Sequence, residues 1–296
     1  MIFVLAAGSS PVDSNPIAVQ YQLAGSTNGA DNLNSTAIFL CDITGVMAEP
    51  WVGHGYDVIL VDPQHPEGVT IETAELGNTI SRVGYVIEHP ETWRVLRNAM
   101  RLSRVVFVAG FPPCTDVAVC GTKNFARKFD EDRHFQAKAA LVAEQCRVIG
   151  QLSGAPWFFE NPISVFSSIF GKPDHIFSPY QFTEFCADDN YFKSTCLWTG
   201  GGFRMPEQAI EPVVKAAVDL VLSRIGKLPS DKKKLMVVHA DKFTAAEIDW
   251  INNYYPDDRI HKAAPGADRA NFRSATPRGF SRAVFWANST HGAILK

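Results

Sequence analysis

The chain has 296 residues, of which 46% are hydrophobic and 20% charged, and its formal net charge is −3 at pH 7. This composition is ordinary for a globular protein with one large domain, or one domain and a small annex. No apolar run approaches the roughly 20 residues that span a membrane, so we expect no membrane partner. The slight negative charge also argues against an evenly basic nucleic-acid binder.

Residues 1–36 are rich in Asn, Ser, Gly and Ala, and they predict an irregular N-terminal arm. The opening residues 1–7 are apolar but lack a basic flank, which is atypical of a signal peptide. The six cysteines form no zinc-type CxxC pair, as is usual for reduced thiols. We therefore expect a cytoplasmic protein without a bound metal.

Strand and helix patterns alternate through the first half of the chain after this arm. The predicted strands are 37–42, 56–62, 105–109 and 156–159, and the predicted helices are 47–52, 91–103 and 133–152. Residues 63–90 give no clear pattern, and residues 115–132 predict a polar loop that could close over a ligand. This alternation predicts an α/β fold with a doubly wound, mostly parallel sheet.

The second half predicts fewer and shorter elements, consistent with a small C-terminal annex. The predicted elements are strands at 191–198 and 235–238, a helix at 212–225 closed by Gly226, a helix opened by the capping box Thr244 to Glu247, and a last helix after Pro277.

Two strand ends carry the residues that point to chemistry. Cys114 closes the run Phe111-Pro-Pro-Cys114, in which two prolines force an extended exit from the strand. Glu160 and Asn161 follow the strand 156–159, and open α/β sheets place their ligands at such carboxyl ends. Each segment alone is also typical of a plain turn. Asp116 could orient a loop or be solvated, and we expect it to be solvated.

A nucleotide-like ligand would have to bind this chain without the common phosphate-binding motifs. Neither the GxGxxG fingerprint nor the P-loop pattern is present. Gly45 allows close backbone approach after the first strand, and Asp62 ends the second strand with a carboxylate that could accept hydrogen bonds from a ribose.

Taken in order, these segments resemble the cytosine-C5 DNA methyltransferase family, most closely its short, divergent bacteriophage and prophage members. The matching segments are Phe39-Leu-Cys-Asp-Ile-Thr-Gly45, Gly55-Tyr-Asp-Val-Ile-Leu-Val-Asp62, Gly110-Phe-Pro-Pro-Cys114, Phe159-Glu-Asn-Pro162 and Arg273-Ser-Ala-Thr-Pro-Arg-Gly-Phe280. The resemblance implies a class I S-adenosyl-L-methionine-dependent methyltransferase fold, with DNA as the partner and a host-cell cytoplasmic location.

The resemblance also implies a role for each motif residue. Cys114 would add to C6 of a flipped-out cytosine, Glu160 would bond N3, and Asn161 would brace the loop. The implied cofactor-binding residues are Asp42, Thr44, Gly45, Asp62, Pro112, Thr276 and Pro277. An acid that reads the adenine amine is expected between residues 63 and 90.

Three departures from the family pattern stand out. Thr115 replaces the usual Gln after the cysteine, and the first motif has the single Gly45. The family's Gln-x-Arg-x-Arg strand has no clear copy, and residues 191–196 take its place. Candidate phosphate or base-support contacts are therefore Lys193, Thr195, Lys232, Lys233, Lys234, Arg269 and Arg273.

The basic residues concentrate toward the C-terminus, with 12 Lys and Arg against 7 Asp and Glu between residues 224 and 282. The predicted organisation is an arm at 1–36, a cofactor-binding and catalytic domain at 37–198, a short target-recognition region at 199–240, and a segment at 241–296 that returns to the catalytic domain. Two alternatives stay open: a non-catalytic relative that binds nucleic acid or cofactor, and an enzyme of the same fold that modifies RNA or a free pyrimidine nucleotide.

Overall fold

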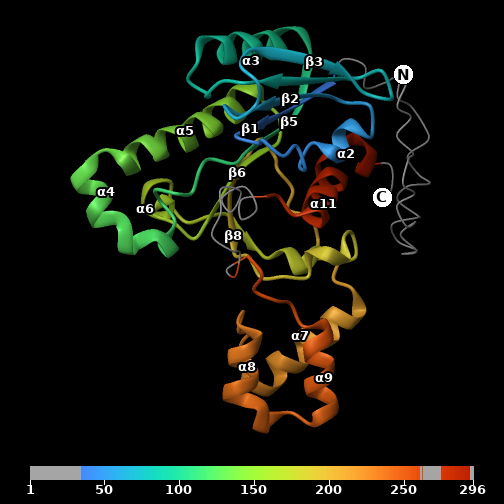
Figure 1. The fold of residues 1–296 in the computed structure, drawn as a ribbon. Coiled ribbons are helices and arrows are strands. Elements are labelled where there is room, and N and C mark those ends of the chain that lie inside the picture. The colour runs from blue at the N-terminus through green and yellow to red at the C-terminus, as the bar shows by residue number, and fades with distance from the viewer. Residues whose placement is uncertain (1–34, 261, 263–274, 294–296) are drawn as a thin grey trace, which may run out of the picture.

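The computed structural model describes residues 35–260, 262 and 275–293, and these form an α/β fold (Figure 1). The strands are β1 (Ser35–Leu40), β2 (Asp57–Val61), β3 (Val69–Thr73), β4 (Thr79–Val83), β5 (Arg104–Gly110), β6 (Trp157–Pro162), β7 (His175–Phe177) and β8 (Thr195–Gly200). The helices are α2 (Glu49–Val52), α3 (Pro90–Leu102), α4 (Phe125–Glu131), α5 (Phe135–Ser153), α6 (Phe166–Ile169), α7 (Pro212–Ile225), α8 (Lys232–His239), α9 (Ala245–Tyr254), α11 (Arg278–Asn288) and α12 (Thr290–Ala293).

The strands form one mixed sheet in the order β3-β4-β2-β1-β5-β6-β8-β7. The pairs β1–β2, β1–β5, β2–β4 and β5–β6 are parallel, whereas β3 and β8 run against their neighbours. The prediction of an α/β fold with a mostly parallel sheet is therefore confirmed. From β1 the chain first adds strands on one side of the sheet, and from β5 it adds them on the other side. The carboxyl ends of β1 and β5 are therefore the switch point of the sheet.

Helices cover both faces of the sheet, because the central strands are apolar on both sides. On one face Phe39 shares a buried cluster with Trp51 of α2 and Phe285 of α11. On the other face Leu40 shares a second cluster with residues of α3 and α5, including Leu96 and Cys146. Successive residues of β1 belong alternately to the two clusters, because the side chains of a strand point to opposite faces of the sheet in turn.

Helices α7, α8 and α9 form a separate layer, called here the helical annex (residues 212–254), which lies below the sheet in Figure 1. Its core joins Val218 and Val221 of α7 to Leu235 of α8 and Ile251 of α9. The core therefore unites α9 with the helices that precede it. This differs from the predicted boundary at residue 240, which separated them.

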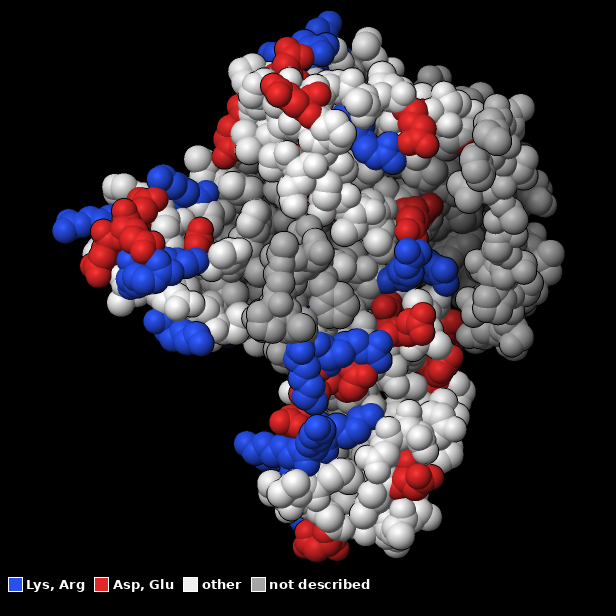
Figure 2. Space-filling view, viewed as in Figure 1, with Lys and Arg blue, Asp and Glu red and all other residues white. Residues whose placement is uncertain are grey.

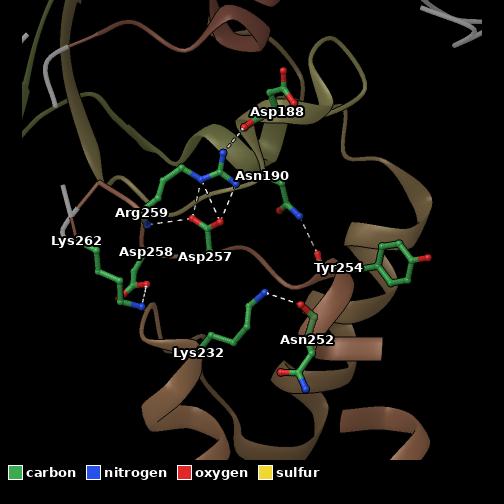
Figure 3. Close-up of polar contacts among 9 residues, drawn as sticks. All are labelled: Asp188, Asn190, Lys232, Asn252, Tyr254, Asp257, Asp258, Arg259 and Lys262. Carbon is green, nitrogen blue, oxygen red and sulfur yellow. Dashed lines mark hydrogen bonds and ion pairs between the residues drawn. The ribbon is translucent and has the colours of Figure 1, made fainter. Parts of the chain in front are cut away.

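A polar network joins the annex to the sheet body (Figure 3). The side chain of Arg259 bonds the carboxylate of Asp257 and the carbonyl of Asp188, the latter at 3.2 Å. Asn190 Nδ2 donates to the Tyr254 carbonyl at 2.9 Å. Further contacts are Lys232 to the Asn252 carbonyl and Lys262 to Asp258. Of these bonds, the one from Asn190 to Tyr254 joins the body to the annex directly, and Arg259 ties the chain after the annex to Asp188 of the body.

Several predicted elements differ from the structure. The predicted strand at 235–238 is part of α8, because Leu235 packs into the annex core and Asp231 accepts from the Lys234 amide as N-cap. The unassigned residues 63–90 contain the β3–β4 hairpin, and the predicted loop 115–132 contains α4. Ser35 and Thr36, placed in the arm by the sequence, open β1, and residues 1–34 lie outside the described residues.

Candidate functional site

The Cys114 turn (residues 112–119) follows β5 at the carboxyl end of the parallel strands. Cys114 is half-buried, and its carbonyl accepts two amides from further along the turn, at 3.1 and 2.9 Å. The far end of the turn is fixed by a 3.0 Å bond from the Val119 amide to the Ile163 carbonyl. The thiol therefore sits on a short turn anchored to the chain that follows β6.

Strand β6 brings Glu160 and Asn161 to the same edge, since β5 and β6 are parallel neighbours. Asn161 is 1% exposed, and its Nδ2 donates to the Pro112 carbonyl at 3.0 Å. That bond joins the end of β6 to the chain two residues before Cys114. The segments of the three residues predicted to be catalytic thus lie side by side.

Glu160 is half-buried, and one of its two carboxyl oxygens is shielded from water. Its Oε2 is buried and has no hydrogen-bond partner among the described residues. Burial raises the pKa of Glu160, and the positive charge of Lys193 lowers it in part. A buried carboxyl that keeps its proton can donate a hydrogen bond to a ligand atom.

Lys193 lies between this carboxyl and the chain that enters α11. Its Nζ donates to the Ala275 carbonyl at 3.1 Å. Thr195, predicted as a nucleic-acid contact, is only 3% exposed, and its hydroxyl donates to the Lys193 carbonyl. The Thr195 side chain is therefore used inside the protein, which argues against a phosphate contact there.

The loop after β1 lies at the switch point of the sheet. Asp42 Oδ1 accepts the Thr44 amide and hydroxyl and the Gly45 amide, at 3.1, 2.9 and 2.8 Å. Its Oδ2 is buried without a partner among the described residues, and burial raises the Asp42 pKa against the effect of these bonds. Gly45 has a φ of 66°, where a side chain would be strained. The loop is a fixed backbone cradle with one unsatisfied acceptor.

Two further acids lie near this loop. Asp62 is 6% exposed at the end of β2, and its Oδ1 accepts the Gln64 amide at 2.8 Å. The charges of Asp62 and Glu88 both raise the pKa of Cys41, where its contact with Cys146 and burial are the larger causes. Among the acids of residues 63–90, Glu88 is thus one whose charge acts on the Cys41 thiol.

Helix α11 returns the C-terminal part of the chain to the same loop. Thr276 and Pro277 lie immediately before it, with Pro277 as its N-cap. Ser281 Oγ donates to the Val46 carbonyl at 2.9 Å, next to Gly45. The predicted cofactor-binding residues at both ends of the chain therefore belong to one region, which Pro112 also borders through the Cys114 turn.

The remaining predicted nucleic-acid contacts lie farther away. Lys233 and Lys234 are exposed on α8, whereas Lys232 Nζ donates to the Asn252 carbonyl at 3.1 Å and ties α8 to α9. Figure 2 shows Lys and Arg side chains gathered where the annex meets the body. Arg269 and Arg273 lie outside the described residues.

Sequence reasoning missed a contact between α4 and the Cys114 turn. Lys128 Nζ bonds the Thr115 carbonyl at 2.9 Å and Asp116 Oδ1 at 2.5 Å. Asp116 is therefore paired, contrary to the expectation that it is solvated. The sequence separation of Lys128 from Cys114 does not predict this contact, because the contact forms only when α4 folds back onto the turn.

A pocket of about 760 Å³ lies between α5 and the aromatic residues Trp157, Phe159 and Trp198. Successive strand residues face opposite sides of a sheet, so this pocket opens on the face away from Glu160. It belongs to a different part of the surface from the Cys114 turn. Its rim carries both the Glu144–Arg147 ion pair and Lys172 with Asp174.

No protein-family model matches the chain, and no curated protein matches it either. Among the described residues, no helix has the length and apolar character needed to cross a bilayer. The same residues contain no group of three or more His, Cys, Asp or Glu that could hold a metal ion. The proposals that follow therefore depend on the geometry and chemistry of the site.

Proposed function

We propose that the protein is an S-adenosyl-L-methionine-dependent methyltransferase that acts on C5 of cytosine in DNA. The observation that carries the proposal is the bond from Asn161 Nδ2 to the Pro112 carbonyl, which joins the strand that carries the desolvated Glu160 carboxyl to the chain two residues before Cys114. C5 of cytosine needs activation before it can accept a methyl group. A thiol and a protonated carboxyl on adjacent strands are suited to provide it.

In this proposal each residue has one task. Cys114 adds through sulfur to C6 of cytosine, which makes C5 nucleophilic. Glu160 donates its proton toward N3, which stabilises the negative charge that the addition places on the ring. Asn161 holds the turn that carries the thiol. After C5 gains the methyl group, it loses its proton, and the sulfur–C6 bond breaks to restore the ring and the thiolate.

The loop after β1 fits a nucleotide-like cofactor. Asp42 has a buried unpartnered oxygen, Thr44 and Gly45 form a rigid backbone cradle, and Asp62 lies at the end of the adjacent strand. S-adenosyl-L-methionine would supply the methyl group when bound there. Glu88 is our candidate for the acid that reads the adenine amine. The α/β sheet and its switch point agree with the class I methyltransferase fold that the resemblance implies.

Covalent trapping tests the proposal. A duplex in which 5-fluorocytosine replaces cytosine cannot lose the C5 substituent as a proton, so the adduct should persist after methylation. We expect a denaturation-resistant protein–DNA species in the presence of cofactor, with the link mapped to Cys114. Cys114→Ser should abolish it, and Cys120→Ser should not.

An adduct that survives Cys114→Ser would contradict the proposal. Absence of any adduct, together with confirmed cofactor binding, would favour an enzyme acting on RNA or on a free pyrimidine nucleotide, or a non-catalytic relative. Repeating the trap with fluorinated RNA and with the fluorinated nucleotide separates these cases.

A further inference from the structure

We propose that Lys128 of α4 is a positioning residue for Cys114: it holds the Cys114 turn and, paired with Asp116, tunes the charge state of the thiol. The contact of Lys128 with the Cys114 turn is the observation behind this role. Its catalytic meaning rests on the proposed function. The effect of the Asp116–Lys128 ion pair on the Cys114 thiol does not depend on the proposed function.

The Cys114 turn is fixed at both ends by hydrogen bonds to β6 and to the residues that follow β6. At the start, Asn161 holds the Pro112 carbonyl. At the end, Val117 accepts the Val165 amide through its carbonyl at 3.1 Å, and residues 118 and 164 form an antiparallel bridge. The part that remains to be held is the short stretch directly after Cys114.

Lys128 holds that stretch. Its ammonium bonds both the Thr115 carbonyl and the Asp116 carboxylate, and Gln136 Nε2 of α5 reaches the Asp116 carbonyl at 3.4 Å. The Lys128 side chain is 18% exposed and that of Asp116 is 39% exposed, so solvent screens the pair less than a fully exposed one. By contrast, the Arg127–Glu131 pair on the same helix is about 60% exposed at both ends (63% and 60%).

A charge in this position acts on the thiol as well as on the backbone. A cation beside a cysteine favours the thiolate, which is the reactive form, and an anion disfavours it. The charged groups nearest the turn are Asp116 within it, Lys128 on α4, Glu160 on β6, and Lys193, which acts on Glu160. The other charged residues of α4, which are Arg127, Asp130 and Glu131, are exposed. The Asp116–Lys128 pair is bonded to the turn directly after Cys114.

The two members of the pair therefore predict opposite effects. Lys128→Met removes the cation and leaves Asp116 unpaired, so the pKa of the Cys114 thiol should rise. Asp116→Asn removes the anion and leaves the cation, so the same pKa should fall. Simple loosening of the turn would move both variants in one direction, which separates an electrostatic role from a purely structural one.

The experiment measures the rate of Cys114 alkylation by iodoacetamide between pH 6 and pH 10, in the full chain and without cofactor or DNA. Cys114 and Cys120 lie on one tryptic peptide, so a Cys120→Ser background with mass-spectrometric detection reports Cys114 alone. Lys128→Met, Lys128→Arg and Asp116→Asn are compared with the control Arg127→Met, which removes a charge from the same helix. Thermal unfolding is recorded for every variant.

We expect the midpoint of the pH profile to rise in Lys128→Met, to fall in Asp116→Asn, and to stay near wild type in Lys128→Arg and Arg127→Met. A midpoint change of one pH unit would change the rate at pH 7.5 about tenfold. Identical midpoints in folded Lys128→Met and wild type would overturn the proposal, as would shifts of the same sign in the two pair variants. If Lys128→Met does not fold, the sign of the Asp116→Asn shift alone decides.

This readout stays informative if the proposed function is wrong, because alkylation needs no methyl transfer. If methyl transfer is observed, Lys128→Met should lower kcat with little change in the KM for DNA, since the thiol rather than substrate binding is altered. A change in KM alone would contradict a positioning role.

Discussion

Glu160 lies in the second half of the buried strand β6, and one of its carboxyl oxygens is buried without a hydrogen-bond partner in the described residues. An unsatisfied buried acceptor is costly, so proteins seldom retain one without a use for it. Protonation removes the charge from the buried group. The same environment that costs stability therefore prepares the carboxyl to donate a hydrogen bond.

Glu160→Gln tests whether the burial of this carboxyl lowers the stability of the protein while it supports methyl transfer. Burial raises the folded pKa above the unfolded value, so the wild type loses stability as the pH rises through the folded pKa and regains it on acidification. The variant lacks that group. Urea unfolding should show it to be more stable than wild type at pH 8, with the difference shrinking toward pH 4, while methyl transfer falls roughly 10²-fold or more. A variant less stable than wild type at pH 8 would contradict the assignment of a desolvated Glu160.

Asp189 makes a similar prediction away from the thiol. Burial raises its pKa to about 6, while a 2.6 Å bond from the Gly279 amide favours the charged form. Its ionisation should therefore cost stability above pH 6, and this cost should disappear toward pH 4. Asp189→Asn keeps an acceptor for the Gly279 amide and should stabilise the protein at pH 8 by up to about 3 kcal/mol. Equal unfolding free energies at pH 8 would refute this.

At the scale of elements, α11 connects the loop after β1 to the rest of the body. It packs its apolar face on the sheet cluster and bonds the Val46 carbonyl through Ser281. Gly279 allows its first turn to approach the chain near Phe182 closely. A Cβ at Gly279 would lie 2.4 Å from the Phe182 carbonyl oxygen. The helix can take this position only without a side chain there.

Gly279→Ala should therefore displace α11. The expected cost is on the order of 1–3 kcal/mol of unfolding free energy, the range for overpacking. Calorimetry should also show weaker binding of S-adenosyl-L-methionine, because Thr276, Pro277 and Ser281 move with the helix. Gly53→Ala is the control, since its Cβ would meet the Glu49 carbonyl at 3.4 Å in a helical conformation. Unchanged cofactor affinity in Gly279→Ala would separate α11 from the cofactor site.

Local signals predicted those elements whose burial follows their own sequence. The capping box at Thr244 and the end of α7 at Gly226 are confirmed, because caps depend on neighbouring residues. The 235–238 segment was predicted wrongly as a strand, since packing in the annex overrides its β-branched residues. Cys114 and Glu160 could be located because strand ends are visible in the sequence. Lys128, Ser281 and Glu88 could not, because their contacts depend on the path of the whole chain.

At the scale of the whole molecule, the annex presents a basic helix on a body that is acidic overall. Lys233 and Lys234 are exposed on α8, at the opposite end of the molecule from α3 (Figure 1). DNA binding by such a surface depends on counterion release and therefore on salt. In the proposed function, the annex would orient the substrate and the Cys114 turn would supply the reacting thiol.

Replacing both Lys233 and Lys234 by Met should weaken binding to duplex DNA and reduce the slope of log K against log salt by about 2. Fluorescence anisotropy at several salt concentrations measures both quantities. Cofactor affinity should not change. The matched control replaces Arg97 and Arg101, two exposed cations of α3, by Met. An equal loss of affinity in the control would show that the effect of α8 is not specific.

The most direct test of the central claim is transfer of label from methyl-labelled S-adenosyl-L-methionine to mixed-sequence duplex DNA, followed by digestion and nucleoside mass spectrometry. We predict label in 5-methylcytosine with the wild type, and none with Cys114→Ala, whose cofactor binding should remain intact by calorimetry. Label in any other nucleoside, or label in 5-methylcytosine with Cys114→Ala, would contradict the assignment of Cys114 and Glu160 as a cytosine-C5 site.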